Sequence, residues 1–455
     1  MKHQNFYNAA KFIENLVNIE QVDKNDELNP SLYITRTREF LRILDNPQEK
    51  LTIIHIAGTS GKGSTSTMIH NVLTEANISS ILLTSPHVTS CIERISLNSQ
   101  YIDPDEFAQL VEQIKPAIEV LHTSALGRPS YGEIMLAIAL LCAKKNTCTH
   151  AVLETGMGGL YDPTNAFHSN IQVITSIGFD HMKFLGNTLE EIAKNKAGVI
   201  KTGGAVFTAE KRSEILKIFQ QKADQEGANM HVVSLDTLNA NFQKEKTIIT
   251  IEENEFEISM PGNAQITNTL LAYHVGKLLK IQLKHVQKGI ARTQLPARIE
   301  TISQEPLIII DGAHNEDKMR NIAQYVQQHA CGAQGKIFLI IAIGSSRAPE
   351  PILAQIVKYA DHIIFTRFEN TFKRCYSPNV LEQLAKPFLK PKSTTEHNLD
   401  PRTALQIILQ KARKDDTVII TGSFFLAGEL RQHWISEQWI LNNKTSFQGG
   451  LHTHS

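Results

Sequence analysis

Residues 57–64 read Ala57-Gly58-Thr59-Ser60-Gly61-Lys62-Gly63-Ser64, between a β-rich run at Leu51–Ala57 and a helical pattern at Lys62–Ala76. A glycine turn between a strand and a helix directs backbone N–H groups and the positive end of the helix dipole at a phosphate. Glycines are needed because side chains would block the backbone's approach. We therefore predict a loop that binds nucleotide phosphates, with Lys62 reaching the outer phosphates and Ser64 offering its hydroxyl to Mg²⁺.

This loop differs from the strict Walker A pattern. The first glycine of that pattern would fall at Ile56, and Gly63 separates Lys62 from Ser64. The plain alternative is a glycine-rich turn with an incidental lysine, and the flanking strand and helix argue against it. The loop by itself predicts bound phosphates and leaves the reaction open.

Apolar strands and amphipathic helices alternate around the loop, which indicates a parallel sheet covered on both faces. Further expected strands are Ile78–Leu83, Ala151–Glu154, Ile171–Ser176 and Ala205–Thr208, and expected helices are Asn8–Ile19, Asp105–Val120, Tyr131–Lys144, Thr188–Ala197, Ala264–Leu279 and His285–Arg292. Residues Ile248–Ile258 alternate as an exposed antiparallel piece would.

A second α/β pattern follows Leu295-Pro296-Ala297-Arg298, where proline predicts a linker. Its expected strands are Leu307–Ile310, Ile337–Ile343, Ile363–Thr366 and Val418–Ile420, and its expected helices are Asp317–Gln328, Pro351–Tyr359 and Ala404–Arg413. We predict an α/β protein with a P-loop domain at 1–295, a smaller Rossmann-like domain at 296–440 and a frayed polar tail at 441–455.

The composition excludes several classes of protein. The 455 residues include 46 basic and 46 acidic side chains, so no bulk charge favours nucleic acid or anionic membrane. Five scattered cysteines without a Cys-x-x-Cys pair fit reduced thiols in the cytoplasm. The N-terminus lacks an apolar signal core, and the apolar run Ile134–Ala143 is too short to span a membrane. We expect a cytoplasmic protein without nucleic-acid or membrane partners.

Three further side chains follow expected strand ends or lie on the next helix. Glu154 ends a buried strand, where α/β sheets place ligands, and a carboxylate near a phosphate loop is a natural Mg²⁺ ligand. His181 follows Asp180 at another strand end and fits a metal ligand, a proton-transfer group or a structural histidine equally well. Lys196, taken alone, is one more surface lysine.

Ordered runs over nearly the whole chain carry a resemblance to a known family. They are Gly58–Ser64; Thr84-Ser85-Pro86-His87 with Glu93-Arg94-Ile95; Glu154-Thr155-Gly156-Met157-Gly158-Gly159 with Asp162 and Thr164-Asn165; Asp180-His181, Leu185-Gly186, Thr188–Ala193 and Lys196-Ala197-Gly198; Arg298; Asp311-Gly312-Ala313-His314-Asn315; and Thr421-Gly422-Ser423. In these runs the chain resembles the folylpolyglutamate synthase/dihydrofolate synthase family, within the Mur ligase superfamily.

The resemblance implies a Mur-ligase-like P-loop domain and a smaller Rossmann-like domain with ATP between them. It implies that Ser64, Glu154 and His181 bind Mg²⁺ and that a carbamoylated Lys196 acts as a further metal ligand. It implies that residues 58–64 with Asn268, Arg298 and Asp311 hold ATP, and that Lys62, His181, Lys196 and His314 serve catalysis. An Ω-loop with Ser85, Pro86, His87, Glu93 and Arg94 would meet the substrate.

The implied reaction joins L-glutamate to a folate or dihydropteroate carboxylate. The carboxylate attacks the γ-phosphate of ATP, and the glutamate amine then attacks the acyl phosphate. ATP and Mg²⁺ are the implied cofactors, a monovalent cation such as K⁺ stays open, and a monomer is expected. The alternatives are a Mur-type ligase for another carboxylate, a P-loop ATPase or kinase, and a binding protein without catalysis.

Four places depart from the family's usual pattern. They are Gly159-Leu160-Tyr161, which lacks a basic residue, Cys91-Ile92, Leu295-Pro296-Ala297-Arg298, and Gly344-Ser345-Ser346-Arg347. None of them touches the phosphate loop. The identity of the substrate is therefore less determined than the ATP chemistry.

Overall fold

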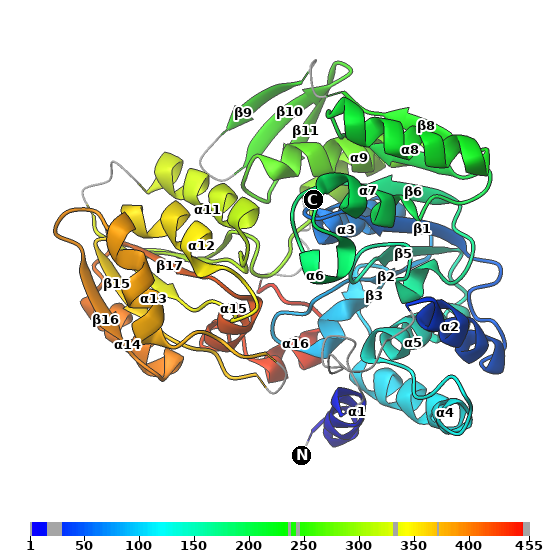
Figure 1. The fold of residues 1–455 in the computed structure, drawn as a ribbon, viewed down its shortest axis with the longest axis horizontal. Helices are drawn as coiled ribbons and strands as arrows, with labels where there is room; N and C mark the ends of the chain where they lie inside the picture. Colours follow the sequence, from blue (N-terminus) through cyan, green and yellow to red (C-terminus); the bar gives the residue numbers. More distant parts are fainter. Residues whose placement is uncertain are drawn as a thin grey trace.

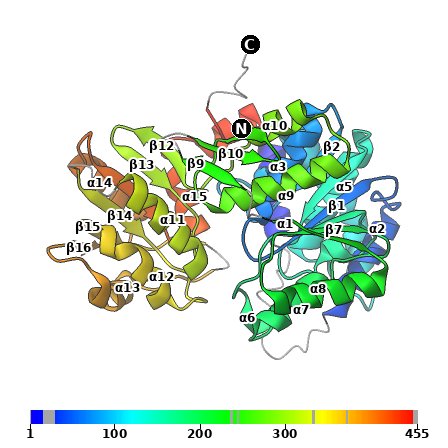
Figure 2. The same ribbon diagram turned by 90° about the horizontal axis from the view of Figure 1, so that it is seen from above.

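The computed structural model describes residues 2–15, 30–234, 238–242, 246–330, 335–370 and 373–448. These residues form two lobes that lie side by side, each built on its own sheet (Figure 1). Helices lie on both faces of each sheet, as the second view shows (Figure 2). The predicted α/β class with parallel sheets is confirmed. Within the described residues, no helix is long and apolar enough to cross a membrane.

The larger lobe contains an eight-stranded sheet in the order β4-β3-β2-β5-β1-β6-β7-β8. Its strands are β1 Thr52–Ala57, β2 Ser80–Leu83, β3 Ile95–Leu97, β4 Gln100–Tyr101, β5 His150–Glu154, β6 Ile171–Ile174, β7 Ala205–Thr208 and β8 Asn229–Val232. The central strand β1 runs parallel to both neighbours, with Ile56 beside Glu154 of β5 and Ala57 beside Ile174 of β6. The carboxyl ends of these three strands therefore open at one edge of the sheet.

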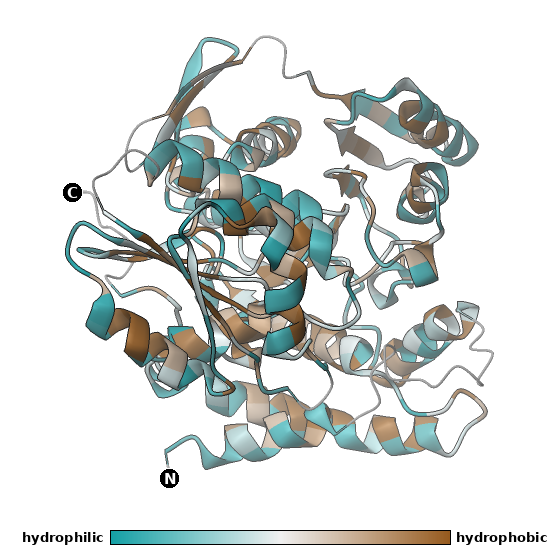
Figure 3. Cartoon of the chain, turned by 60° about the vertical axis from the view of Figure 1, so that its left-hand side comes forward, coloured by the Kyte–Doolittle hydropathy of each residue, from teal (hydrophilic) through white to brown (hydrophobic). Residues whose placement is uncertain are grey.

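Helices cover both faces of this sheet. They are α1 Gln4–Glu14, α2 Ser31–Ile43, α3 Lys62–Glu75, α4 Pro104–His122, α5 Tyr131–Lys145, α6 Met182–Leu185, α7 Leu189–Ala197, α8 Ser213–Glu226, α9 Ala264–Leu278 and α10 Leu283–Ala291. Apolar stripes face inward and polar residues outward, so single helices carry both colours in Figure 3. Helix α10 approaches α3 so closely that a Cβ at Gly289 would lie 2.5 Å from the Val72 backbone. That contact fixes where α3, and the loop before it, sit on the sheet.

The smaller lobe contains a six-stranded sheet in the order β12-β13-β17-β14-β15-β16, in which only β12 runs antiparallel to its neighbour. Its strands are β12 Glu300–Gln304, β13 Leu307–Ile310, β14 Ile337–Ile341, β15 His362–Phe365, β16 Thr394–His397 and β17 Thr417–Thr421, and its α-helices are α11 Glu316–His329, α12 Pro349–Ile356, α13 Pro378–Ala385, α14 Pro401–Lys411 and α15 Phe424–Arg431. Helix α16 Glu437–Asn443 follows them in the chain and packs on the core of the larger lobe. The domain boundary expected near residue 296 stays a prediction.

Several elements differ from the sequence expectation. Helix α1 begins at Gln4 and ends at Glu14, whereas the expected helix extended to Ile19, beyond the described residues. Residues 248–258 do form antiparallel strands, within the sheet β11-β10-β9 (Asn254–Ile258, Thr247–Ile251, Asn239–Phe242), but Ile249 and Phe256 are fully buried rather than exposed. The expected tail begins inside α16, where Leu441 is buried because it faces the core under α4 and α5.

Candidate functional site

The predicted phosphate loop follows β1 and leads into α3. Gly61 has φ of +86°, and a Cβ there would lie 2.4 Å from Asn268 Oδ1. Gly58 has φ of +148°, and a Cβ there would lie 1.9 Å from Thr175 Oγ1. Only glycine fits either position. The first N–H groups of α3 have no partner inside the helix, so the turn presents donors to an anion.

Neighbouring residues hold this loop in place. The Thr59 N–H donates to the Ser176 carbonyl at 2.8 Å, and the Ser60 N–H donates to Ser176 Oγ at 3.0 Å. Asn268 on α9 supports the other side, because its Oδ1 accepts from Thr65 Oγ1 at 3.2 Å. Asn268 thus lies behind the Gly61 turn, and its contact with the loop is through the side-chain amide.

Glu154 and Ser64 lie beside the loop. Glu154 is at the end of β5, and its Oε2 would be 3.5 Å from a Cβ at Gly63. The same oxygen accepts from the Ser85 N–H at 2.9 Å. Burial raises the pKa of the Glu154 carboxyl, while Lys62 opposes that shift. Ser64 is on the first turn of α3 and is 3% exposed.

Lys196 is not a surface residue. It lies on α7, is 2% exposed and donates from Nζ to the Gly58 carbonyl at 2.8 Å. Burial, with a contribution from Lys62, lowers the pKa of the Lys196 ammonium to about 7. A substantial fraction of this amine is therefore neutral and nucleophilic near neutral pH. Sequence reading alone placed this lysine on the surface because helix periodicity cannot show what covers a helix end.

His181 follows β6, in a loop that turns back toward α7. Its backbone is left-handed, with φ of 48°, and its N–H donates to Asp180 Oδ1 at 3.0 Å. Burial lowers the pKa of the imidazole to about 4, although Asp180 opposes the shift. The neutral ring keeps a lone pair for a metal or a proton. Burial would raise the pKa of Asp180, but His181 and Arg347 hold it well below its ordinary value.

The smaller lobe adds a second set of side chains. Asp311 follows β13, and its carboxylate accepts from the Ile299 N–H at 2.8 Å and the Ala313 N–H at 2.7 Å. Arg298 lies over the Phe424 ring, 4.2 Å from its centroid. His314 Nδ1 is 2.8 Å from the Gly312 carbonyl, which assigns the proton to Nδ1 and leaves Nε2 as an acceptor.

That acceptor is used by Lys318, whose Nζ lies 3.2 Å from His314 Nε2. Burial lowers the pKa of the Lys318 ammonium to about 7. Sequence reading missed Lys318 and Arg347. The spacing of four residues from His314, on the helix that follows it, was the available signal for Lys318. Arg347 lies in the turn 344–347, which the sequence marked only as a departure from the family's pattern, and no local pattern indicated its partner.

The expected substrate loop divides into two groups. Ser85, Pro86 and Glu93 line a cavity, while His87 and Arg94 do not. The Glu93 carboxylate accepts from the N–H groups of Val88, Thr89 and Ser90 within the loop, at 2.7, 3.2 and 3.4 Å. Arg94 donates to the Thr84 carbonyl at 3.2 Å and lies over the Tyr131 ring at 4.9 Å. Both charged side chains thus shape the loop.

This cavity has a volume of about 1760 Å³ and lies between the lobes. Gly63, Ser85 and Glu154 line it from the larger lobe. Arg298 and Tyr325 line it from the smaller lobe. A ligand bound there would meet the phosphate loop at one end and both lobes along its length.

The donor set fits a nucleotide phosphate with Mg²⁺. The loop supplies N–H groups and an ammonium, and Glu154 supplies a carboxylate to the cavity, whereas Ser64 and His181 are not among the residues that line it. Within the part of the chain that the structure describes, no three His, Cys, Asp or Glu side chains gather as a ready metal site. Mg²⁺ usually takes one or two protein ligands and completes its shell with phosphate oxygens and water, which suits this arrangement.

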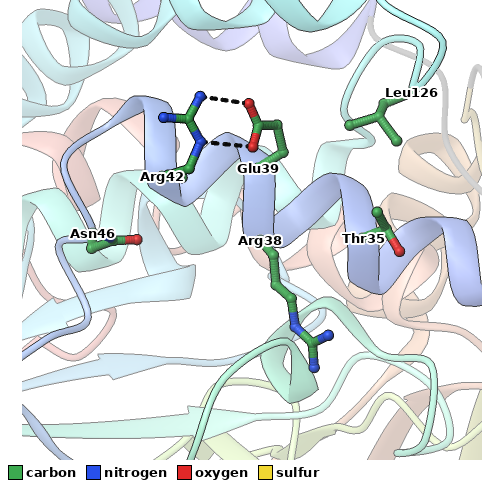
Figure 4. A pocket seen from close by; sticks show the side chains of 6 residues that line it. All are labelled: Thr35, Arg38, Glu39, Arg42, Asn46 and Leu126. Carbon is green, nitrogen blue, oxygen red and sulfur yellow. Dashed lines mark hydrogen bonds and ion pairs between the residues drawn. The ribbon is translucent and has the colours of Figure 1, made fainter.

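A separate shallow hollow lies along α2 (Figure 4). Its two arginines are already engaged: Arg42 pairs with Glu39 at 2.8 Å, and Arg38 donates to the Ala166 carbonyl at 2.7 Å. The hollow contains none of the residues that the sequence singled out.

Each lobe matches the model of a known protein family. Residues 56–276 match the Mur ligase middle domain, and residues 297–433 match the dihydrofolate synthetase C-terminal domain. A Bacillus subtilis dihydrofolate synthase/folylpolyglutamate synthase is 31% identical over 87% of this chain and 94% of its own. A probable dihydrofolate synthetase of Schizosaccharomyces pombe is 29% identical over 88% and 98%. The crystal structure of a Thermotoga maritima folylpolyglutamate synthase has a TM-score of 0.80 and 25% identity, and the match covers 98% of this chain and 99% of that one.

Proposed function

Because the chain belongs to the dihydrofolate synthase/folylpolyglutamate synthase family, we propose that its interlobe cavity joins L-glutamate to the carboxylate of dihydropteroate or of a folate. As a ligase of this family it would use ATP, with Mg²⁺ as the accompanying metal. One observation supports the placement of this chemistry above the others. Gly63 of the phosphate loop, Glu154 and Arg298 line a single cavity to which both lobes contribute.

The roles of the side chains follow from their positions. Lys62 and the N–H groups at the start of α3 would hold the β- and γ-phosphates and neutralise charge that develops during phosphoryl transfer. Ser64, Glu154 and His181 would hold Mg²⁺, which withdraws charge from the phosphate oxygens. Asp311 and Asn268 act on the ATP side by fixing the backbone around Ile299 and Gly61. Arg298 and His314 would complete the phosphate environment from the smaller lobe.

A carboxylate condenses with an amine only after its oxygen becomes a leaving group. The substrate carboxylate would attack the γ-phosphorus and release ADP, and the glutamate amine would then attack the acyl carbon and release phosphate. Water would hydrolyse the acyl phosphate, so enclosure by the two lobes protects it.

Lys196 would act as a carbamate. A neutral lysine amine adds to CO₂ and loses a proton, which converts a cation into a carboxylate-like group that can face the metal. The burial of Lys196 and its lowered pKa support this role, because they supply the neutral amine.

Dihydropteroate is the substrate we favour, since the smaller lobe matches the dihydrofolate synthetase C-terminal domain. We further propose that the enzyme works as a monomer in the cytoplasm. Among the described residues, Cys91, Cys142, Cys148 and Cys375 carry free thiols.

ADP release with each substrate omitted in turn tests the function. Release that requires Mg²⁺, glutamate and either dihydropteroate or tetrahydrofolate would support the proposal, and the better of the two carboxylates identifies the preferred reaction. Release without glutamate would instead indicate an ATPase or kinase. Release with glutamate but with neither pteridine would indicate a Mur-type ligase for another carboxylate.

A further inference from the structure

The turn that carries Arg347 is fixed to the smaller lobe on both sides. The Arg347 N–H donates to the Gly344 carbonyl at 3.2 Å, and Tyr376 Oη donates to the Arg347 carbonyl at 2.9 Å. Gly344 also forms a β-bridge with Cys375, and the Ser345 N–H donates to the Arg374 carbonyl at 2.9 Å. The position of the Arg347 backbone is therefore fixed by contacts that do not involve its side chain.

The Arg347 guanidinium reaches across to the larger lobe. Its Nη1 donates to Asp180 Oδ1, and the two side chains are only 22% and 9% exposed. The same oxygen accepts from the His181 N–H at 3.0 Å. One carboxylate oxygen thus joins the smaller lobe to the backbone of His181.

A second contact between the lobes reaches the same loop. Gly178 lies so close to the first turn of α11 that a Cβ there would be 3.0 Å from Asp317 Oδ2. Residues 178–181 are therefore held between the smaller lobe and the phosphate loop, to which Gly178 is tied by hydrogen bonds with the Thr59 hydroxyl at 3.0 Å.

We infer that Arg347 is a positioning residue: through Asp180 it orients His181, so that His181 takes its working position when the lobes are together. Without Arg347 the Asp180 carboxylate is free to turn toward the His181 imidazole, whose Nε2 is 3.8 Å away, or toward the lysines of the site. Either move would break the hydrogen bond from the His181 N–H to Asp180 Oδ1, which supports the left-handed backbone conformation of His181. The inference rests on the proposed function.

The competing explanation is direct contact between Arg347 and a phosphate. The two explanations differ in a double-mutant cycle. If Arg347 acts through Asp180, its removal has no further effect once Asp180 is changed. If it binds phosphate, the two losses multiply.

The experiment compares wild type with Arg347→Ala, Arg347→Lys, Asp180→Asn and the double variant Arg347→Ala/Asp180→Asn. Glutamate-dependent ADP release is measured against the concentrations of Mg²⁺ and ATP, together with thermal unfolding. Arg374→Ala is the matched control, since this exposed arginine lies in the adjoining segment and contributes its backbone carbonyl to the turn.

We expect Arg347→Ala to lower kcat by roughly tenfold or more and to raise the half-saturating Mg²⁺ concentration, in a protein that remains folded at the assay temperature. Arg347→Lys should recover part of kcat, the double variant should resemble Asp180→Asn, and Arg374→Ala should match wild type. Wild-type kcat in Arg347→Ala, multiplying losses, or a shift confined to the KM for ATP would each overturn the inference. A wild-type protein without glutamate-dependent turnover would refute the proposed function itself.

Discussion

The ammonium groups of Lys62 and Lys196 donate to one acceptor, the carbonyl oxygen of Gly58, at 3.1 and 2.8 Å. Among the described residues neither lysine has a carboxylate partner within ion-pair distance. Two cations on one carbonyl repel each other, and this repulsion contributes to the lowered pKa of Lys196. A phosphate bound at the loop would relieve this repulsion. Without an anion, the repulsion favours the neutral amine of Lys196.

Replacing Lys62 with alanine should lower kcat by about 100- to 1000-fold, because a positioned cation beside the transferring phosphoryl group is lost. The fold should persist, since the glycine turn does not depend on this side chain. Steady-state ADP release and circular dichroism measure the two effects. Lys217→Ala, on the exposed side of α8, is the control. If the Lys62→Ala enzyme kept full turnover, the proposal that this loop holds the transferred phosphate would be wrong.

Lys196 should carry a carbamate in the active enzyme. Crystallographic density on Nζ gives a direct measurement, because the group can be lost in acidic mass analysis. Exhaustive removal of CO₂ should lower activity, and bicarbonate should restore it. Lys196→Ala should be inactive and partly rescued by a short carboxylate such as acetate. If no density extends beyond Nζ and activity does not depend on CO₂, then Lys196 acts as the free amine.

Changing Glu93 to glutamine should destabilise the protein by about 1–3 kcal/mol, because an amide nitrogen would face backbone N–H groups that now donate to the carboxylate. Urea unfolding measures this loss, and Glu190→Gln on α7 is an exposed control. A variant of normal stability with a raised KM for the pteridine substrate would show that Glu93 binds substrate directly.

His70 should make the protein sensitive to acid. Its Nε2 accepts from the Ser99 N–H at 2.9 Å, so the neutral ring places its proton on Nδ1, 2.9 Å from Ser80 Oγ. Burial lowers the pKa of the folded imidazole from 6.5 to about 3. Between these values the unfolded chain binds a proton that the folded chain does not, so stability falls as the pH falls, by up to about 1.4 kcal/mol per pH unit.

The variant His70→Gln lacks this titration. The difference in unfolding free energy between wild type and variant should therefore narrow as the pH is lowered from about 6.5 toward 3. Urea unfolding at several pH values measures it, with His122→Gln, at the exposed end of α4, as the control. A constant difference across this range would mean that His70 does not titrate between the two states.

The sequence alone determined the strand–loop–helix around Gly58–Ser64, the central parallel strands, and the alternation of strands and helices in the smaller lobe. These features come from local periodicity and from glycine positions that the backbone itself requires, and both are readable within a few residues. Sequence reading missed polar edge strands such as β12 and β16, where no strong period exists, and it also missed several helices, among them α2, α8, α13 and α15.

Only the tertiary structure decided what each side chain of the site contacts. Lys196 became a buried amine because the helix that carries it ends against the Gly58 loop, and Glu93 became a structural acceptor because the loop folds around its carboxylate. Arg347 met Asp180 although 167 positions separate them in the chain. Burial and pairing depend on which surfaces pack together, and a local sequence pattern carries no record of its distant partners.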